Sequence, residues 1–490
     1  MYKEDLLNRH DRIVYRIILD VYLQDGKANL VGISERLKIP LSTLKRYLSG
    51  LKRELAPWVK QNKIAFGVSG TQVTFQLFGV ATIEEILVEK RLVTADNVVL
   101  LKFLYQHHLR YQGVQLMRLL HVSEASLYRK LRVLNQLLAP FDLMVGHGQL
   151  TGNLRQLQFF YFNFWRTIGT KMPVLKETAA IRQYLIDAGF MFDEQLTERL
   201  NTWLTVCQHS AQNQWHFRQK TSVQVQRLVA AMPVEIQIPS QVVANVDIDC
   251  ETLAFFLMLH SEFVFSDGLW TKFLRKTSAP IKRLNRLIGV CQAGLNDGWP
   301  VTDSSPQLTT QKLAGLLIVP LLTKGDVQIF NDISFRYFNR VFFDASDDAA
   351  FMRVHQQMTQ TASPWINRFM QAHWSYIERR LWPYLVTKSA NSMPPVTVGL
   401  ALGFSEQVTL FTKRQLKNEL KKHFAVSVET YQPDLKVDLL VVNERTASSI
   451  VTPQKQAVER ITELGTETDY QRIARRLQAL KSGTHLGSSK

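Results

Sequence analysis

Two stretches of the chain carry the hydrophobic pattern of a helix, a tight corner and a second helix. In residues 115–138 the apolar positions recur every three or four residues around a corner at residues 121–123: Leu116, Leu119, Leu120, Leu127, Leu131, Leu134 and Leu138. Residues 32–55 repeat this pattern 83 positions earlier, with Ile39, Leu44, Leu48 and Leu51 in place of Val122, Leu127, Leu131 and Leu134. Such spacing predicts amphipathic helices, so we predict a helix-turn-helix that occurs twice.

The residues around each helix-turn-helix complete a winged helix. Helical spacing over residues 11–24 predicts a first helix, and Pro57 is expected to end the third. Residues 64–77 alternate at period two around Ser69-Gly70, which predicts a hairpin, and such a wing normally lies on phosphate. In the second unit a linking helix over residues 83–91 precedes a first helix, and a less regular hairpin spans residues 141–150.

The rest of the chain divides into a helical middle and an α/β tail. The pattern is helical from Leu154 to about Leu385, and the polar cluster at residues 294–306 suggests that two domains meet near residue 290. After Pro394-Pro395, strand-like and helical runs alternate, which predicts a small parallel α/β domain. The expected fold class is mainly α. The expected domains are two winged helix-turn-helix units at residues 1–80 and 81–153, two all-helical domains at 154–290 and 291–390, and an α/β domain at 391–490.

Charge favours a polyanionic partner. The 490-residue chain has a formal net charge of +17, from 59 Lys and Arg against 42 Asp and Glu. Residues 1–150 alone hold 21 Lys and Arg against 13 Asp and Glu, a net of +8. Because this excess coincides with the winged units, we expect double-stranded DNA as the partner.

Cysteine usage and hydropathy set the expected compartment. Cys207, Cys250 and Cys291 are too far apart for a disulfide framework or a paired metal motif, so we expect buried, reduced thiols. The charged start of the chain lacks the apolar core of a leader, and no apolar run reaches the roughly 18–20 residues that span a bilayer. No carboxylate or thiolate completes a tetrahedral metal site with His209 and His216. We therefore expect a cytoplasmic protein with no membrane segment, metal or cofactor.

The polar sides of the two recognition helices supply the candidate DNA contacts. Arg to guanine is the commonest specific contact, whereas hydroxyls and Tyr usually hold the DNA backbone. In the first helix the candidates are Ser42, Thr43, Lys45, Arg46, Tyr47 and Ser49, with Lys52 and Arg53 expected on phosphates. In the second helix they are Glu124, Ser126, Tyr128, Arg129, Lys130 and Arg132. The alternative for each residue is the ordinary solvated face of a helix.

One histidine segment carries a resemblance to a known family. The sequence ETLAFFLMLH, which ends at His260 after the acidic residues 247–251, resembles the second-histidine segment of PRD modules. These are regulatory domains phosphorylated by the sugar phosphotransferase system of Gram-positive bacteria. With two winged helices ahead and an α/β tail behind, the entire chain resembles the Mga and AtxA family of transcriptional regulators, and the domain order carries most of this resemblance.

The resemblance implies regulation through histidine. PRD histidines accept phosphate from phosphotransferase-system phosphocarrier proteins, and each phosphate adds roughly −1.5 to −2 charges. His209 takes the position of the partner histidine in the first PRD-like domain, although His216 competes with it. The second PRD-like domain lacks the Leu-His ending. The expected phosphorylation candidates are His209, His260, His355 and His373; the alternative for each is a hydrogen-bonded histidine on a helix face.

The tail resembles the enzyme-IIB-like domain of the same family. A phosphate-carrying IIB domain needs a cysteine after the first strand, and residues 402–405 contain none, so Ser405 is expected as a helix N-cap. The resemblance therefore implies oligomerisation instead of phosphate transfer. We expect a transcriptional regulator, more often an activator, that forms a homodimer and is not an enzyme.

Four other functions stay open at this point. A phosphotransferase-linked phosphocarrier would need a nucleophilic Cys or His on the tail loop. Tri-helical units also serve as protein-interaction modules. A BglG-like RNA antiterminator has two PRDs but opens with a short β-rich domain, whereas this chain opens with about 150 residues of helical units. A replication initiator with two winged helices would leave the helical middle unexplained.

Overall fold

The computed structural model describes most of the chain. The described residues are 1–79, 81–83, 85–213, 215, 226–228, 230–231, 250–298, 309–325, 332–342, 345–392, 396–402, 406–421, 426–432, 434–443, 457–462 and 465–481. They fall into two compact units. The first unit comprises Met1–Gln292, Leu308–Tyr337 and Ser363–Arg380, and the second comprises Ala293–Gln307, Phe338–Ala362 and Leu381–Lys490.

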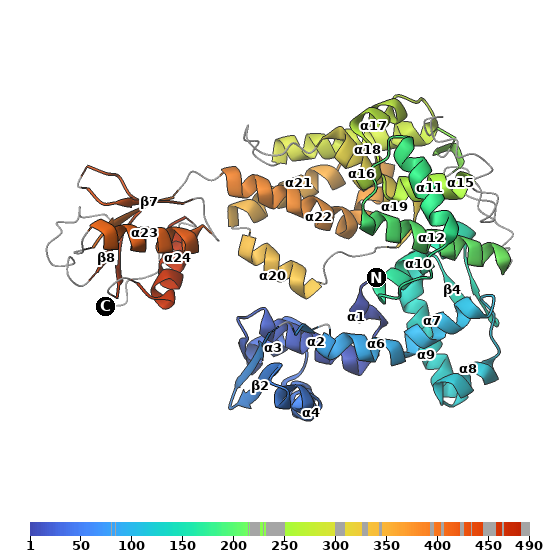
Figure 1. Ribbon diagram of the computed structural model, residues 1–490, viewed down its shortest axis with the longest axis horizontal. Coiled ribbons are helices and arrows are strands. Elements are labelled where there is room, and N and C mark those ends of the chain that lie inside the picture. The colour runs from blue at the N-terminus through green and yellow to red at the C-terminus, as the bar shows by residue number, and fades with distance from the viewer. Residues whose placement is uncertain are drawn as a thin grey trace. The chain divides into compact units, whose positions relative to one another are not determined.

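The first winged helix follows the predicted order (Figure 1). Its elements are α1 Lys3–Leu6, α2 Arg9–Tyr22, β1 Lys27–Asn29, α3 Leu30–Leu37, α4 Leu41–Glu54, α5 Ala56–Lys60, β2 Ile64–Ser69 and β3 Gln72–Leu77. The hairpin β2–β3 is confirmed, and β1 pairs with β3 as a third strand. Pro57 does not simply end a helix, because it stands in the first turn of α5, where a missing N–H costs nothing.

The second winged helix repeats this arrangement. Its elements are η1 Glu85–Glu89, α6 Lys90–Thr94, α7 Asp96–Gln106, α8 Gly113–Leu120, α9 Glu124–Leu138, η2 Ala139–Phe141, β4 Met144–Gly146 and β5 Gln149–Thr151. Arg110 bridges Gln149 at the position that β1 takes in the first unit. Phe141 lies in η2 and not in the expected strand, and Leu119 is 39% exposed instead of buried.

The corner of each helix-turn-helix has the same backbone geometry. Lys38 ends α3 at φ 55°, and His121 ends α8 at φ 53°, both in the left-handed region. Each corner is followed by a residue packed against the core, Ile39 in one copy and Val122 in the other. The predicted 83-residue repeat is therefore confirmed in three dimensions, because residues 38 and 121 are equivalent in it.

The helical middle follows the second winged helix and begins with α10. Its elements are α10 Leu154–Thr167, α11 Lys176–Asp187, α12 Glu194–Gln212, α15 Cys250–Leu259, α16 Ser261–Val264, α17 Asp267–Leu274, α18 Ala279–Gly298, α19 Thr310–Leu322, α20 Asp332–Phe342, α21 Ala345–Thr359 and α22 Pro364–Ser392. Within the first unit, α10 packs against α12, and α19 packs against α15, α16 and α17 (Figure 1). The polar cluster begins inside α18, which runs helically through residue 290 to Gly298.

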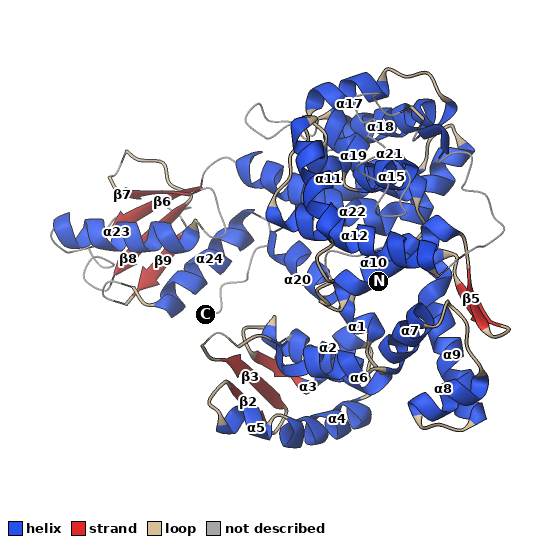
Figure 2. Cartoon of the chain, turned by 45° about the vertical axis from the view of Figure 1, so that its right-hand side comes forward, coloured by secondary structure: helices blue, strands red, loops and turns tan. Residues whose placement is uncertain are grey.

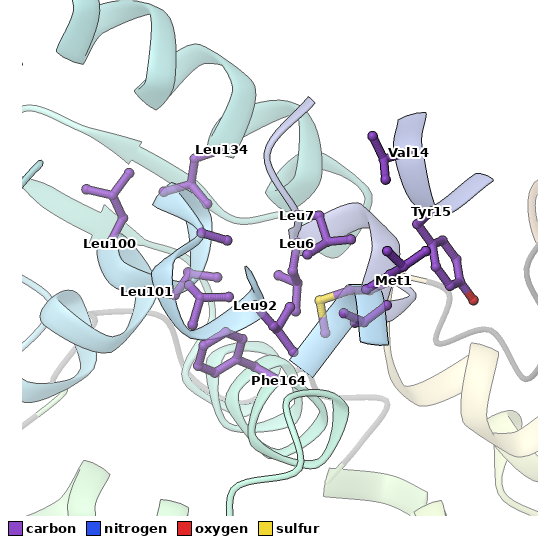
Figure 3. Close-up of a cluster of buried hydrophobic side chains, with 14 of the residues drawn as sticks. Met1, Leu6, Leu7, Val14, Tyr15, Leu92, Leu100, Leu101, Leu134 and Phe164 are labelled. Atoms are coloured by element: carbon purple, nitrogen blue, oxygen red, sulfur yellow. The ribbon is translucent and has the colours of Figure 1, made fainter. Parts of the chain in front are cut away.

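The start of the chain fills the space between the winged units. Figure 3 shows Met1, Leu6 and Leu7 directed into a cluster with side chains of α6, α7, α9 and α10. Leu6, Leu101 and Phe164 in this cluster have no exposed surface. Continuous burial of apolar side chains makes the two winged helices and α10 one packed body.

The tail folds as the predicted parallel α/β domain (Figure 2). Its elements are β6 Val396–Ala401, α23 Glu406–Leu420, β7 Val426–Thr430, β8 Leu439–Asn443, β9 Val458–Ile461 and α24 Glu467–Lys481. The strands are all parallel, in the order β7-β6-β8-β9, and α23 and α24 pack against each other. The turn with Ser405 lies outside the described residues. The predicted mainly α fold is thus confirmed, with β9 as an additional strand.

Candidate nucleic-acid interface

Helix α4 separates an apolar side from a polar one. Leu44, Leu48 and Leu51 are buried against the core of the first winged helix. The polar candidates are exposed or, for Thr43, half-buried: Ser42, Thr43, Lys45, Arg46, Ser49, Lys52 and Arg53. At about 100° per residue Ser42, Arg46, Ser49 and Arg53 point away from the leucines, and Thr43, Lys45 and Lys52 lie at the sides of the helix. The helix can present this exposed surface to a groove.

Tyr47 differs from the other candidates on α4. It is half-buried and packs against the core, and its ring centroid lies 5.1 Å from that of His10 on α2. At the end of the same helix, Glu54 Oε2 accepts a hydrogen bond from Arg91 Nη2 at 2.6 Å. The Arg91 Nε also lies 3.3 Å from Asp11 Oδ1. These contacts hold α4 against α2 and α6, and the Tyr47 side chain takes part in that packing.

Helix α9 presents the corresponding face of the second winged helix. Glu124, Tyr128, Arg129 and Arg132 are exposed, and Ser126 is half-buried. The Arg129 Nε donates to the Ala125 carbonyl oxygen at 3.3 Å, and its Nη2 donates to Ser126 Oγ at 3.4 Å. These weak, exposed bonds keep the guanidinium over the N-terminal half of the helix, which is the half that meets base edges in this motif.

Lys130 forms an ion pair within its own winged helix. Its Nζ donates to the Asp96 carboxylate, and both side chains are half-buried. Lys130 is 83 residues after Tyr47, and both side chains face the first helix of their unit. The reason is helical geometry, because this position lies between the groove-facing side and the leucine stripe. The structure therefore places Tyr47 and Lys130 beside the exposed face rather than on it.

Asn135 is a residue that the sequence pattern did not single out. Its side chain accepts a hydrogen bond from the Val145 N–H at 2.7 Å and donates one to the Val145 carbonyl oxygen at 2.8 Å. Two bonds to one backbone unit fix β4 against α9 and so set the position of the wing beside the recognition helix. The signal in the sequence is the Asn135-Gln136 pair between Leu134 and Leu137 in an otherwise apolar run.

His209 lies where α12 meets α7 of the second winged helix. Its Nε2 donates to the Tyr105 carbonyl oxygen at 2.8 Å, and its ring stacks on the Tyr105 ring with centroids 3.9 Å apart. Burial lowers the pKa of His209, against the opposing effect of the bond to Tyr105. A neutral imidazole with Nε2 engaged leaves Nδ1 as its basic nitrogen.

His260 is buried among aromatic rings. It is 6% exposed, lies between Phe162 and Phe256, and its Nε2 has no hydrogen-bond partner among the described residues. Burial lowers the pKa of His260 well below its ordinary value, and the charges of Arg166 and Arg199 act in the same direction. The side chain is therefore neutral at physiological pH.

The other histidine candidates lie on helices of the later region. His355 is half-buried on α21, and burial lowers its pKa. His373 is half-buried on α22, with its ring centroid 4.7 Å from that of Phe369. His216, which competed with His209 in the sequence, lies outside the described residues.

Polar contacts join the helical middle to the second winged helix. Gln156, at the start of α10, forms two hydrogen bonds with the Lys324 backbone, of 2.6 and 2.9 Å. The Lys324 Nζ donates to Asp142 at the base of the second wing at 2.7 Å. On the same helix, Arg155 donates to Thr252 of α15. These bonds connect α10 to α15 and, through Lys324, to the base of the second wing.

The fold contains two winged helix-turn-helix units, each with an exposed polar face on its recognition helix. Residues 80–165 match the family model for the Mga helix-turn-helix domain, from the linking helix through α9 and its wing into α10. This segment is therefore a Mga-type helix-turn-helix domain, a DNA-binding domain of transcriptional regulators. A search of curated proteins found no match.

The described residues contain neither a membrane-spanning helix nor a metal-binding cluster. No described helix combines the length and the apolar character needed to cross a bilayer. Among the same residues, no group of three or more His, Cys, Asp or Glu is arranged to hold a metal ion.

Proposed function

We propose that this protein is a transcriptional regulator of the Mga type, and more specifically an activator, that contacts promoter DNA through both winged helices. The observation that carries the proposal is the family match over residues 80–165, which places α9 and its exposed arginines in a DNA-binding domain. The 83-residue repeat supports the same role for α4. The candidate contacts are the residues given above, with Tyr47 and Lys130 acting through the placement of their helices.

We also propose how the protein is regulated and how it assembles. Residues 154–290 and 291–390 act as PRD-like domains that receive phosphate from phosphotransferase-system phosphocarrier proteins in the cytoplasm. Residues 391–490 act as an enzyme-IIB-like domain that holds a homodimer together. Exposed Leu410 and Phe411 on α23, at 51% and 54%, support an interface there, because large apolar side chains side by side favour association.

The double substitution Arg129→Ala with Arg132→Ala tests the DNA-binding proposal. We expect affinity for a random-sequence DNA duplex to fall about 10- to 100-fold at low salt, because two exposed cations leave the recognition face. The slope of log affinity against log salt should become shallower by about one for each phosphate that the variant no longer neutralises. The measurement is a salt titration by fluorescence anisotropy, repeated with an RNA duplex.

The control removes the same charge elsewhere in the first unit. Arg275→Ala with Lys276→Ala changes two exposed cations in the loop after α17 and should leave both affinity and slope nearly unchanged. Equal losses of affinity in the two double variants would mean that the effect comes from net charge and not from the recognition face of α9. A preference for RNA would favour the antiterminator alternative instead.

The contacts of His209 give its phosphorylation a physical consequence. The imidazole stacks on Tyr105 of α7, the first helix of the second winged unit. A phosphate on this ring would place roughly −1.5 to −2 charges against that helix. It would therefore loosen or reorient the winged unit. His260, by contrast, would need the surrounding aromatic rings to open before a phosphocarrier could reach it.

Incubation with phosphoenolpyruvate and the general phosphotransferase proteins tests this part. We expect phosphate on His209 ahead of His260, because His209 is half-buried and His260 is buried. The label should be acid-labile, as expected for phosphohistidine, and should fall strongly in His209→Ala but not in His107→Ala, which removes an exposed histidine at the end of α7. Intact protein that stays unlabelled would contradict phosphotransferase control.

A further inference from the structure

The two recognition helices carry an arginine at one shared position. Arg46 is the sixth residue of α4, which begins at Leu41, and Arg129 is the sixth residue of α9, which begins at Glu124. The two arginines are 83 residues apart, which is the repeat that also relates the corners at Lys38 and His121. Both copies thus carry an arginine at the same position of the recognition helix.

That position faces directly away from the protein core. Arg46 lies two residues after Leu44 and two before Leu48, so at about 100° per residue its side chain points roughly 200° from Leu44 around the helix. Arg129 has the same relation to Leu127 and Leu131. Both arginines are exposed, and a helix lying in a groove would direct them to its floor.

The preceding turn leaves room for a close approach. Four residues before each arginine, on the same face, stands a small exposed residue, Ser42 in α4 and Ala125 in α9. A long side chain there would hold the helix away from the bases. In α9 the guanidinium also donates to the Ala125 carbonyl oxygen and to Ser126, so it is held near the groove-facing end before DNA arrives.

The flanking positions differ between the copies. One residue before the arginine stands Lys45 in α4 and Tyr128 in α9, and three residues after it stands Ser49 in α4 and Arg132 in α9. Side chains of different size and charge select different neighbouring bases or phosphates. The two helices therefore share the arginine position and differ at the positions around it.

We propose that Arg46 and Arg129 each read a guanine, so that the operator contains two half-sites with a guanine at the equivalent position and different flanking sequences. Arg can donate two hydrogen bonds to guanine O6 and N7 in the major groove, which makes it selective for that base. This inference rests on the proposed DNA-binding function and adds the base that each winged helix selects.

Selection from a randomised DNA duplex library with the purified full chain tests the proposal. The wild-type protein should enrich two guanine positions at a fixed separation. Arg46→Ala should abolish the preference at one of them and Arg129→Ala at the other, each with on the order of 10- to 100-fold loss of discrimination. Arg46→Lys and Arg129→Lys keep the charge but lose the planar fork, so they should weaken the preference while keeping most of the salt slope.

The remaining outcomes separate the two proposals. Lys52→Ala, an exposed cation on the same helix, should weaken binding uniformly across sequences without removing either guanine. Uniform weakening by the Arg46 and Arg129 variants would overturn the guanine assignment and leave DNA binding intact. Loss of the same single guanine in both variants would overturn the equivalence of the helices. No enrichment and no duplex binding by the wild type would refute the proposed function itself.

Discussion

Phe164→Ala is expected to destabilise the first unit by about 3–5 kcal/mol, the usual cost of removing a fully buried Phe side chain. Phe164 on α10 has no exposed surface and lies in the cluster with Met1, Leu6 and Leu101 (Figure 3). Its ring also meets Trp165 edge-on, with centroids 5.1 Å apart. Because this cluster joins both winged helices to α10, the loss of stability should extend to DNA binding. The measurement is the free energy of opening from amide hydrogen exchange in α7 and α9.

A second Phe→Ala substitution in the same unit serves as the control. Phe78, just after β3, is 46% exposed, so Phe78→Ala should cost less than about 1 kcal/mol. Hydrogen exchange reports the local opening of individual helices. It therefore does not require the two compact units to unfold in a single transition. Comparable protection of α7 in the two variants would mean that the cluster does not hold the winged helices together.

The winged helices could be predicted because their pattern is local. Leucines at three- and four-residue spacing determine which side of α4 and α9 is buried, and tertiary packing agrees with that choice at Leu44 and Leu127. The strand β1 was missed because Lys-Ala-Asn is too short to show alternation. The strand forms because it pairs with β3. In β9, Val-Glu-Arg-Ile shows little of the apolar pattern of a buried strand.

The surroundings of the candidate side chains could not be predicted in the same way. Tyr and Lys are residue types that suit a DNA-contacting face. Only the contacts of Tyr47 with His10 and of Lys130 with Asp96 show that both side chains turn toward the protein. The contact between His209 and Tyr105 joins residues 104 apart in the chain. No periodicity encodes such a pair, because it depends on how α12 packs against α7. The burial of His260 has the same origin.

Glu4→Gln is expected to stabilise the first unit above pH 7 and to leave it nearly unchanged below pH 4.5. Glu4 on α1 is 7% exposed, and its Oε2 has no hydrogen-bond partner among the described residues. Burial, opposed by the charge of Arg16, raises the pKa of Glu4 from 4.5 to about 7. Gln removes the charge that burial penalises and keeps the shape of the side chain.

The sign follows from proton linkage. Between pH 4.5 and 7 the unfolded chain has lost the Glu4 proton while the folded chain keeps it, so stability falls as pH rises through this window. Below pH 4.5 both states are protonated and the penalty is absent; above pH 7 it is complete, at about 3 kcal/mol for a shift of this size.

Hydrogen exchange in α2 and α7 at pH 5 and pH 8, corrected for intrinsic rates, should show protection of the wild type falling relative to Glu4→Gln. Glu124→Gln, on an exposed turn of α9, should change protection by less than about 0.5 kcal/mol at both pH values. If Glu4→Gln behaved like this control at pH 8, Glu4 would have to be solvated or fully paired with Arg16 when ionised.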